Sequence, residues 1–293
     1  METEGMPDRR GRVRTDLAGV PETTLWTLYH RAREADSAYS VIEDPKAIDV
    51  LAAIDFDFYG RFGSAPPWLG RFIGLRAAAF DTQVRQFMNA YPGATVVVLG
   101  EGLETQFWRV DDGKVRWFTV ELPETAALRT ALLPDDPPRR RTLAGSALDP
   151  KWIEELGATA DDHVMVVAQG LLMYLPPAQV RALIQRCAEE FPGGSMVFDT
   201  VPRRVSQLTV RGLPGPGGYR PPPMPWGVTP GRLVDELSED PAIGRARLVD
   251  PPAIGDPLSS TVLTARRLLP LMRRHGPAVV RLDFQRGCPG KRP

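Results

Sequence analysis

Two glycines and one carboxylate are the residues of this chain best suited, by type and spacing, to hold a ligand. Thr95–Leu99 is a short apolar run rich in β-branched residues, and Gly100 and Gly102 follow it in a Gly-Glu-Gly turn. A second strand-like run, Val115–Val120, ends at Glu121, roughly 20 residues after the turn. A buried strand, a glycine turn and a second strand that ends in a carboxylate are typical of a nucleotide-binding β-α-β unit. In such a unit the carboxylate accepts hydrogen bonds from two ribose hydroxyls.

The residues around this turn favour one nucleotide ligand over another. A dinucleotide fingerprint needs a third glycine that lets a pyrophosphate approach a helix N-terminus, and Thr105 stands at that position. Glu101 and Glu104 add two carboxylates, which repel a pyrophosphate but tolerate a cationic sulfonium with its ammonium group. S-adenosylmethionine is therefore favoured over NAD. A structural strand-turn-helix without any ligand stays open as the alternative.

Three further polar residues stand where they can join this site. Gln169 follows a strand-like run, Ser146 begins a turn that leads into a helix, and Arg76 lies beside the apolar stripe of a predicted helix. An arginine in that position either extends to water or reaches the pocket and pairs with a ligand carboxylate in a bidentate contact. The sequence leaves both alternatives for Arg76 open.

The elements that must position these residues follow from the hydrophobic pattern. Four strand-like runs alternate with helical segments: Thr95–Leu99, Val115–Val120, His163–Ala168 and Ser195–Thr200. This alternation predicts an α/β protein with a mostly parallel sheet and helices on both faces. Ligands bind at the carboxyl ends of such strands, where the glycine turn, Glu121, Ser146 and Gln169 would meet. A short helix at Leu268–His275 and a final strand at Ala278–Phe284 are also predicted.

We expect three regions along the chain. Residues 1–14 form a flexible arm, residues 15–92 a helical cap region and residues 93–293 the ligand-binding core. The cap region contains three predicted helices: Thr23–Ala35, Asp44–Ile54 and Leu69–Tyr91. The core carries a proline- and glycine-rich insertion at about residues 208–227, and the basic run Arg139–Arg141 is predicted to be a solvated loop.

The composition argues against several classes of partner. Lys+Arg and Asp+Glu both number 36, so the zero net charge offers no overall field for nucleic acid or an anionic membrane. The 2 cysteines have no metal-binding spacing, and no apolar run reaches the roughly 18 residues of a membrane span. The N-terminus lacks an apolar signal core, so a cytoplasmic protein is expected. We expect no metal, nucleic acid or membrane partner, and a homodimer is left open.

The motifs together resemble the leucine carboxyl methyltransferase family, in its bacterial branch of polyketide O-methyltransferases. The resemblance covers roughly residues 72–198 and rests on five segments: LRAAAFDTQVRQFMNAYP, VVVLGEGLETQFWRV, VRWFTVELPE, AGSALDPKW and VAQGLLMYLP. It implies a Rossmann-like class I methyltransferase fold, in which a seven-stranded, mostly parallel sheet with an N-terminal helical cap binds S-adenosylmethionine.

The resemblance also implies roles for individual residues. Arg76 matches the arginine that binds the methionine carboxylate. Gly100 and Gly102 match the turn under the methionine, and Glu121 matches the acid that holds the ribose. The remaining matches are Ser146 and Ala147 beside the adenine, Gln169 and Gly170 beside the cofactor's amino end, and Tyr174 toward the substrate.

The chain departs from the family pattern around the turn. The family has Cys or Ala at Glu101, Asp-Thr-Arg at residues 104–106, Asp at Glu121 and Glu at Gln169. The amide of Gln169 lacks the charge that would attract the ammonium group of the cofactor. We hypothesise that the carboxylate of Glu101 partly supplies that charge.

These observations predict an S-adenosylmethionine-dependent O-methyltransferase that releases S-adenosylhomocysteine. Its acceptor is a small aromatic or polyketide-type molecule with a carboxylate, which is already ionised, or a phenol, which needs a base. Tyr174 either orients the acceptor or only packs, whereas Tyr219, Met224 and Trp226 either form its lid or lie in a surface excursion. Two alternatives stay open: a methyltransferase-like binding or scaffold protein that has lost methyl transfer or promotes another reaction, and an NAD-dependent oxidoreductase.

Overall fold

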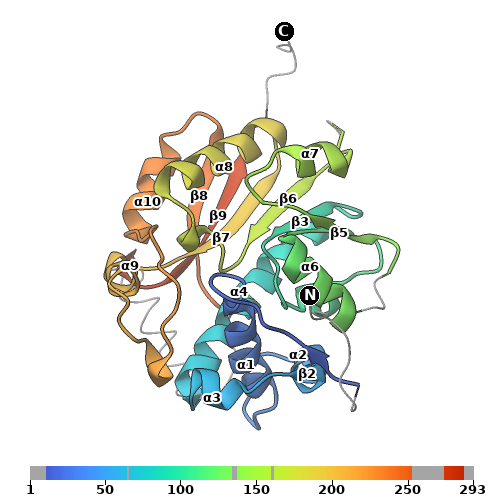
Figure 1. The fold of residues 1–293 in the computed structure, drawn as a ribbon. Helices are drawn as coiled ribbons and strands as arrows, with labels where there is room; N and C mark the ends of the chain where they lie inside the picture. Colours follow the sequence, from blue (N-terminus) through green and yellow to red (C-terminus); the bar gives the residue numbers. More distant parts are fainter. Residues whose placement is uncertain (1–10, 65, 134–136, 160–161, 253–273, 287–293) are drawn as a thin grey trace.

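A seven-stranded sheet forms the centre of the molecule (Figure 1). The computed structural model describes residues 11–64, 66–133, 137–159, 162–252 and 274–286. From edge to edge the strands are β5 (Arg140–Ala144), β4 (Arg116–Glu121), β3 (Thr95–Leu99), β6 (Val164–Ala168), β7 (Ser195–Thr200), β9 (Ala278–Phe284) and β8 (Ile243–Val249). The strands from β5 to β7 are parallel, and β9 is antiparallel to β7 and β8. The predicted seven-stranded, mostly parallel sheet is confirmed.

The central strands bring the glycine turn and its carboxylate to one edge of the sheet. β3 and β6 are buried along their whole length, and their sequences, TVVVL and VMVVA, are apolar throughout because helices cover both faces. Leu99 pairs with Val120 in a parallel register. Gly100, which follows β3 directly, and Glu121, the last residue of β4, therefore stand side by side.

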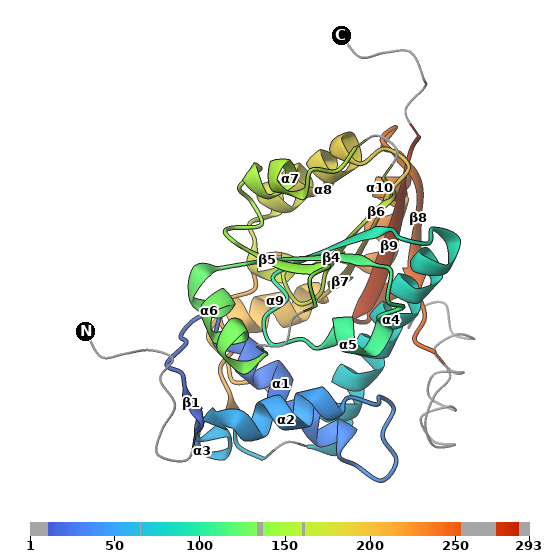
Figure 2. The same ribbon diagram turned by 90° about the vertical axis from the view of Figure 1, so that its right-hand side faces the viewer.

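Helices cover both faces of the sheet (Figure 2). α4 (Pro67–Ala90) and α5 (Gln106–Val110) pack on one face, where Phe80, Val84 and Phe87 belong to one buried cluster with Val96 and Val98 of β3. α7 (Lys151–Leu156), α8 (Pro177–Glu190) and α10 (Pro230–Ser238) pack on the other face. Each cluster combines strand residues with helix residues, and the latter lie at helical spacing.

The N-terminal helices lie together beyond the carboxyl ends of the parallel strands (Figure 1). α1 (Thr23–Ala35), α2 (Pro45–Ala53) and α3 (Phe58–Phe62) share a buried cluster with Leu103 and with Leu128 of α6 (Pro123–Leu132). Asp44 caps α2, because its carboxylate accepts a hydrogen bond from the Ala47 N–H at 3.0 Å. The bounds of α1, α2 and α4 lie within two residues of the predicted helices.

Two segments differ from what the sequence predicts. Val13–Arg14 form the short strand β1, which pairs with β2 (Ile54–Asp55), so the expected flexible arm does not extend to Arg14; residues 1–10 lie outside the described residues. The predicted solvated loop at Arg139–Arg141 is wrong from Arg140 onward, because Arg140 and Arg141 belong to β5 and Arg140 is 4% exposed. This guanidinium can be buried because it meets the carboxylate of Glu101.

The second half of the chain contains elements without a clear sequence signal. α9 (Arg203–Val210) extends into the start of the proline- and glycine-rich stretch, which also holds the single turn η2 (Pro216–Gly218). η1 (Leu172–Tyr174) follows β6. Most of the helix predicted at Leu268–His275 lies outside the described residues. Within the described ranges, no helix is both long enough and apolar enough to span a bilayer.

Candidate functional site

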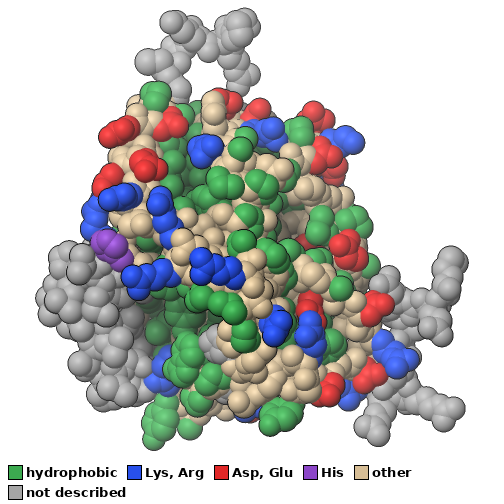
Figure 3. Space-filling view, turned by 60° about the vertical axis from the view of Figure 1, so that its left-hand side comes forward, with side chains coloured by type: hydrophobic (Ala, Val, Ile, Leu, Met, Phe, Trp, Pro, Cys, Tyr) green, Lys and Arg blue, Asp and Glu red, His purple; other side chains and the backbone are tan. Residues whose placement is uncertain are grey.

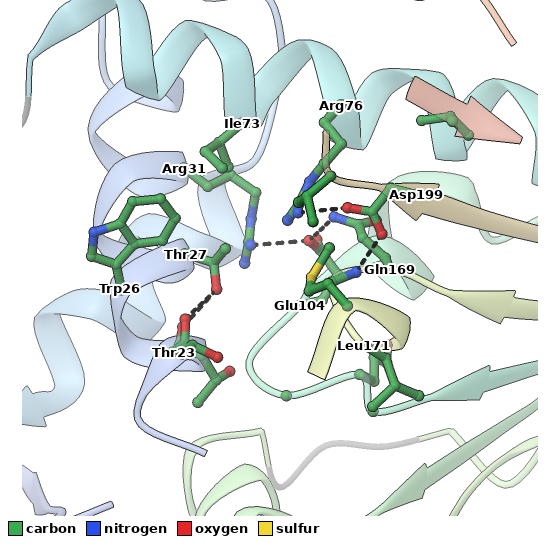
Figure 4. A pocket seen from close by; sticks show the side chains of 18 of the residues that line it. Thr23, Trp26, Thr27, Arg31, Ile73, Arg76, Glu104, Gln169, Leu171 and Asp199 are labelled. Atoms are coloured by element: carbon green, nitrogen blue, oxygen red, sulfur yellow. Dashed lines mark hydrogen bonds and ion pairs between the residues drawn. The ribbon is translucent and has the colours of Figure 1, made fainter. Parts of the chain in front are cut away.

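A cavity of about 1160 Å³ opens at the carboxyl ends of the parallel strands. The ends of β3, β4, β6 and β7 line it from the sheet, and α1 and α4 line it from the cap (Figure 4). The chain runs from β3 outward to β4 and β5 but returns to β6 on the opposite side of β3. The cavity therefore lies at the switch point of the sheet, which is where α/β proteins of this kind bind ligands.

The glycine turn forms the floor of the cavity and is held by Glu121. Gly100 and Gly102 have φ values of +63° and +55°, a conformation that glycine adopts without strain. The carboxylate of Glu121 accepts hydrogen bonds from the Gly102 N–H at 2.6 Å and the Leu122 N–H at 2.9 Å. Burial raises the pKa of Glu121 above its ordinary value, while these two N–H groups act in the opposite direction. Each carboxylate oxygen keeps a second lone pair, with which it can accept a ribose hydroxyl.

Arg76 reaches the cavity from α4. Its Nη1 lies 3.1 Å from Asp199 Oδ2, and Asp199 Oδ1 accepts the Gly170 N–H at 2.7 Å. The Arg76 and Asp199 side chains are 13% and 7% exposed, so this ion pair is largely shielded from water. Of the two alternatives left by the sequence, the structure therefore favours the one in which Arg76 extends into the pocket.

Gln169 lies at the same end of the cavity and is bound to a network of charges. Its Nε2 donates to Glu104 Oε2 at 3.0 Å, and the same carboxylate meets Arg31 Nη1 at 3.0 Å and Arg109 Nη1 at 2.7 Å. Burial alone would raise the pKa of Glu104, but the two guanidiniums outweigh it and lower the pKa to about 2. Glu104 is consequently a carboxylate at every physiological pH.

The structure contradicts the hypothesis that Glu101 offers its charge to the ammonium group of the cofactor. Glu101 lines the cavity, but its side chain is fully buried and its oxygens meet Arg129 Nη2 at 3.0 Å and Arg140 Nη2 at 3.4 Å. Thr119 also donates to this carboxylate. Its charge is directed toward these two buried guanidiniums instead. Glu104, from the same turn, is the carboxylate next to Gln169.

The segment after β5 places Ser146 and Ala147 along the cavity, on the same side as Glu121. Gly145 N donates to the Glu121 carbonyl at 2.8 Å, which fixes the start of this segment beside β4. The Ala147 carbonyl accepts the Trp152 Nε1–H at 3.1 Å. Ser146 and Ala147, the residues expected beside the adenine, therefore line the same cavity as Glu121.

Of the residues expected to face the acceptor, Tyr174 and Met224 line the cavity, whereas Tyr219 and Trp226 are absent from its described lining. Tyr219 stacks on Trp26, with ring centroids 6.1 Å apart, and donates to Glu22 Oε2 at 3.4 Å. Trp226 packs on Phe198 at 6.1 Å. A lid made by the proline-rich stretch is therefore supported at Met224 alone. Burial raises the pKa of Tyr174 to about 12, so its hydroxyl stays protonated.

Three functional side chains were not found from the sequence: Arg31, Glu104 as a partner of Gln169, and Asp199. Asp199 belongs to β7, and an acid near the end of a parallel strand is a signal that could have been used. Arg31 lies within α1, where helical periodicity alone does not distinguish a buried arginine from a solvated one.

α9 adds apolar surface beside the cavity. Val205 lines the cavity and is 37% exposed, and Leu208 and Val210 of the same helix are 48% and 57% exposed. Figure 3 shows hydrophobic and basic side chains next to one another on the side that comes forward in that view. The rim of the cavity is thus partly apolar, which suits an apolar ligand.

The polar end of the cavity fits S-adenosylmethionine. Arg76 offers a guanidinium to a carboxylate, and its Nε is buried without a hydrogen-bond partner among the described residues. Gln169 Oε1 is buried and equally without a donor in the described part of the chain, so it can accept from an ammonium group. Glu121 stands beside the glycine turn for the ribose. Sheet order and site together define a class I, S-adenosylmethionine-dependent methyltransferase.

Comparisons with known proteins agree with this class. The sequence profile described as "Leucine carboxyl methyltransferase" matches residues 24–188. Tetracenomycin polyketide synthesis O-methyltransferase TcmP of Streptomyces glaucescens is 31% identical over 186 residues, which cover 63% of this chain and 67% of that protein. S-adenosyl-L-methionine-dependent methyltransferase dpfgK of Gibberella zeae is 26% identical over 217 residues, or 69% of this chain and 72% of that protein. The chain belongs to the leucine carboxyl methyltransferase family, as the sequence motifs predict.

A solved structure supports the fold. A Thermobifida fusca YX protein, described provisionally as a methyltransferase, matches with a TM-score of 0.50 at 16% identity. The match covers 87% of this chain and 94% of that one. This likeness confirms the predicted fold class, and the family match with its named relatives confirms the predicted enzyme class and cofactor.

Proposed function

We propose that this methyltransferase transfers the methyl group to a carboxylate oxygen of a small aromatic or polyketide-type acid. The observation that carries this proposal is the chemistry of the cavity lining. Among the lining residues that the structure describes there is no histidine, and the acids meet cations or N–H donors. A phenol would need a base to remove its proton, whereas a carboxylate is already ionised at neutral pH.

The size and lining of the cavity support an apolar acceptor. Small-molecule sites commonly measure about 300–1,000 Å³, so a cavity of about 1160 Å³ has room for a cofactor and a second molecule. Beyond the polar end its walls include Trp68, Phe72, Leu75 and Met224. Phe72 and Trp68 are 38% and 60% exposed, so aromatic surface is available at the entrance. The likeness to a protein named for tetracenomycin polyketide synthesis supports the same acceptor class.

The reaction requires little acid–base chemistry from the protein. When bound, the cofactor supplies an electrophilic methyl group on a sulfonium, which leaves as a neutral thioether while the acceptor oxygen gains the methyl group. Arg76 and Gln169 would hold the methionine end of the cofactor, and the glycine turn would lie under it. Tyr174, protonated and buried, can donate a hydrogen bond that orients the acceptor. Positioning and exclusion of water then account for the rate enhancement.

Calorimetric titration of the purified protein with S-adenosylmethionine, S-adenosylhomocysteine and NAD tests the cofactor assignment. We expect binding in roughly the micromolar range for the first two and none for NAD, because no third glycine admits a pyrophosphate. The acceptor is then tested with matched pairs of aromatic compounds that carry either a free carboxyl or only a phenol, with ester formation followed by mass spectrometry.

Methyl ester formation from the acids alone would support the proposal. Methylation of phenols with no ester product would overturn the carboxylate assignment, and binding without transfer to any acceptor would favour a binding or scaffold role.

A further inference from the structure

Two side chains that we expect to bind the cofactor, Arg76 and Gln169, each contact one buried carboxylate. Asp199 Oδ2 meets Arg76 Nη1 at 3.1 Å, and Glu104 Oε2 accepts Gln169 Nε2 at 3.0 Å. Figure 4 shows these four side chains at one end of the pocket, with Arg31 on the other side of Glu104. Both acids come from turns or strand ends of the sheet, whereas Arg76 comes from α4.

Asp199 fixes the direction in which Arg76 presents its guanidinium. Because Asp199 Oδ1 also accepts the Gly170 N–H at 2.7 Å, its carboxylate cannot rotate without losing a buried hydrogen bond. With Nη1 held there, the edge of the guanidinium that contains Nε remains for a ligand carboxylate. Nε has no hydrogen-bond partner among the described residues, as expected of a donor that awaits a ligand.

Glu104 fixes the orientation of the Gln169 amide. Its carboxylate is held by Arg31 and Arg109 and can only accept hydrogen bonds, so the NH₂ group of Gln169 must face it. The carbonyl oxygen Oε1 then faces the other way, and it is buried without a donor from the described chain. A reversed amide would place two acceptors 3.0 Å apart and is excluded by that repulsion.

We propose that Asp199 and Glu104 are positioning residues that aim Arg76 and Gln169 at the carboxylate and the ammonium of the cofactor's methionine end. A guanidinium and an amide oxygen, each fixed by a buried acid, match the two opposite charges of an α-amino acid. This inference rests on the proposed function, and it extends recognition from the residues that contact the cofactor to the two acids that hold them.

The experiment compares two ligands that differ only in this part of the molecule. S-adenosylhomocysteine carries the amino acid, whereas 5′-methylthioadenosine has the same nucleoside and sulfur without it. Binding of both is measured by calorimetry for the wild-type protein and for Asp199→Asn, Glu104→Gln and Gln169→Leu. We expect each variant to bind S-adenosylhomocysteine about tenfold more weakly, while binding of 5′-methylthioadenosine changes less than about twofold.

Glu121→Gln is the matched control, because this carboxylate stands at the ribose that both ligands share. This variant should weaken the binding of both ligands by a similar factor and leave the ratio of their affinities unchanged. A variant that merely loosened the fold would also weaken both ligands together, so the ratio separates positioning from stability. Gln169→Leu leaves Glu104 with its two arginines, so it remains informative if Glu104→Gln does not fold.

The two possible failures have different signatures. A wild-type protein that binds neither ligand would overturn the proposed function itself. A wild-type protein that prefers S-adenosylhomocysteine, with Asp199→Asn and Gln169→Leu variants that keep the same preference, would overturn the positioning roles and leave the proposed function intact.

Discussion

At the scale of single residues, His30 of α1 is a buried side chain whose ordinary pKa lies near neutral pH. It is 1% exposed, and neither ring nitrogen has a hydrogen-bond partner among the described residues. Its ring lies edge-on to Trp26 at 4.6 Å and beside Tyr29 at 5.4 Å. Burial, with a smaller contribution from the charge of Arg33, lowers the pKa of His30 to about 4. The native state therefore holds this imidazole neutral.

This neutral histidine makes stability depend on pH in a defined direction. The unfolded chain binds a proton at His30 below its ordinary pKa of 6.5, but the native state does not until about pH 4. The contribution is therefore complete above pH 6.5 and is lost as the pH falls toward 4. Between about pH 7 and about pH 5.5 we expect a loss of about 1 kcal/mol in the free energy of unfolding from this group.

Urea denaturation of the wild-type protein and of His30→Leu at both pH values checks this expectation. Protonation of carboxylates changes the free energy of unfolding equally in both proteins. Between the two pH values, the free energy of unfolding should therefore fall by about 1 kcal/mol less in the variant than in the wild type. An identical loss in the two proteins would show that the native state does not lower the pKa of His30.

At the scale of elements, α1 packs against the segment that contains the glycine turn. The Leu103 N–H donates to Thr24 Oγ1 at 2.5 Å, and Arg31 Nη2 donates to the Leu103 carbonyl at 2.8 Å. A Cβ atom placed on Gly102 would lie 2.2 Å from Thr24 Oγ1. α1 thus contacts the glycine turn, which also forms the floor of the cavity. Gly102 is suited to this position because it adopts a positive φ without strain and leaves room for Thr24 of α1.

Replacement of Gly102 by alanine should therefore cost more than backbone strain alone. Gly113→Ala is the matched control, because Gly113 has a φ of +78° but nothing within 4 Å of a Cβ atom. We expect Gly113→Ala to lower the free energy of unfolding by about 1 kcal/mol and Gly102→Ala by about 2–4 kcal/mol. Thermal and urea denaturation measure the difference. If Thr24→Ala does not restore part of the stability of Gly102→Ala, the contact with α1 is not its cause.

The elements themselves could largely be predicted from the sequence, because their signals are local. The runs that became β3, β6 and β7 are apolar and bounded by turns, and α1 has a regular apolar stripe. β5, with the sequence RRTLA, was hidden because Arg140 is buried by an ion pair with Glu101, 39 residues away along the chain. A local pattern cannot contain a partner at that distance.

The candidate site could be predicted in part for a related reason. The glycine turn, Glu121 and Gln169 stand at strand ends, and the sheet brings strand ends together whatever their side chains. Tyr219 and Trp226 were expected near a ligand but lie in apolar clusters. An aromatic residue in a proline-rich stretch meets either need, because both a ligand pocket and a core demand apolar surface. The direction of these side chains is set by tertiary packing, which the sequence pattern does not carry.

At the scale of the whole molecule, a buried set of ion pairs joins the cap to the sheet. Arg31 of α1 meets Asp44 at 2.9 Å and Glu104 at 3.0 Å, and Arg109 meets the same two acids at 2.7 Å each. The Arg31 side chain is 2% exposed and that of Asp44 is 0% exposed. Removal of one charge from such a set leaves the others desolvated and only partly compensated. The attachment of the cap therefore depends on these charges.

A comparison of one buried and one exposed arginine tests this dependence. Arg31→Met should lower the free energy of unfolding by about 3 kcal/mol, because two buried carboxylates lose a partner. Arg61→Met is the matched control: Arg61 also pairs with a cap carboxylate, Glu22, at 2.5 Å, but its side chain is 49% exposed. Water replaces that partner, so the cost should stay below about 1 kcal/mol. Urea denaturation followed by tryptophan fluorescence measures both values, and equal losses would show that burial does not set the strength of these contacts. Since Arg31 also holds the Leu103 carbonyl, its loss should weaken S-adenosylhomocysteine binding as well, whereas Arg61→Met should leave that binding unchanged.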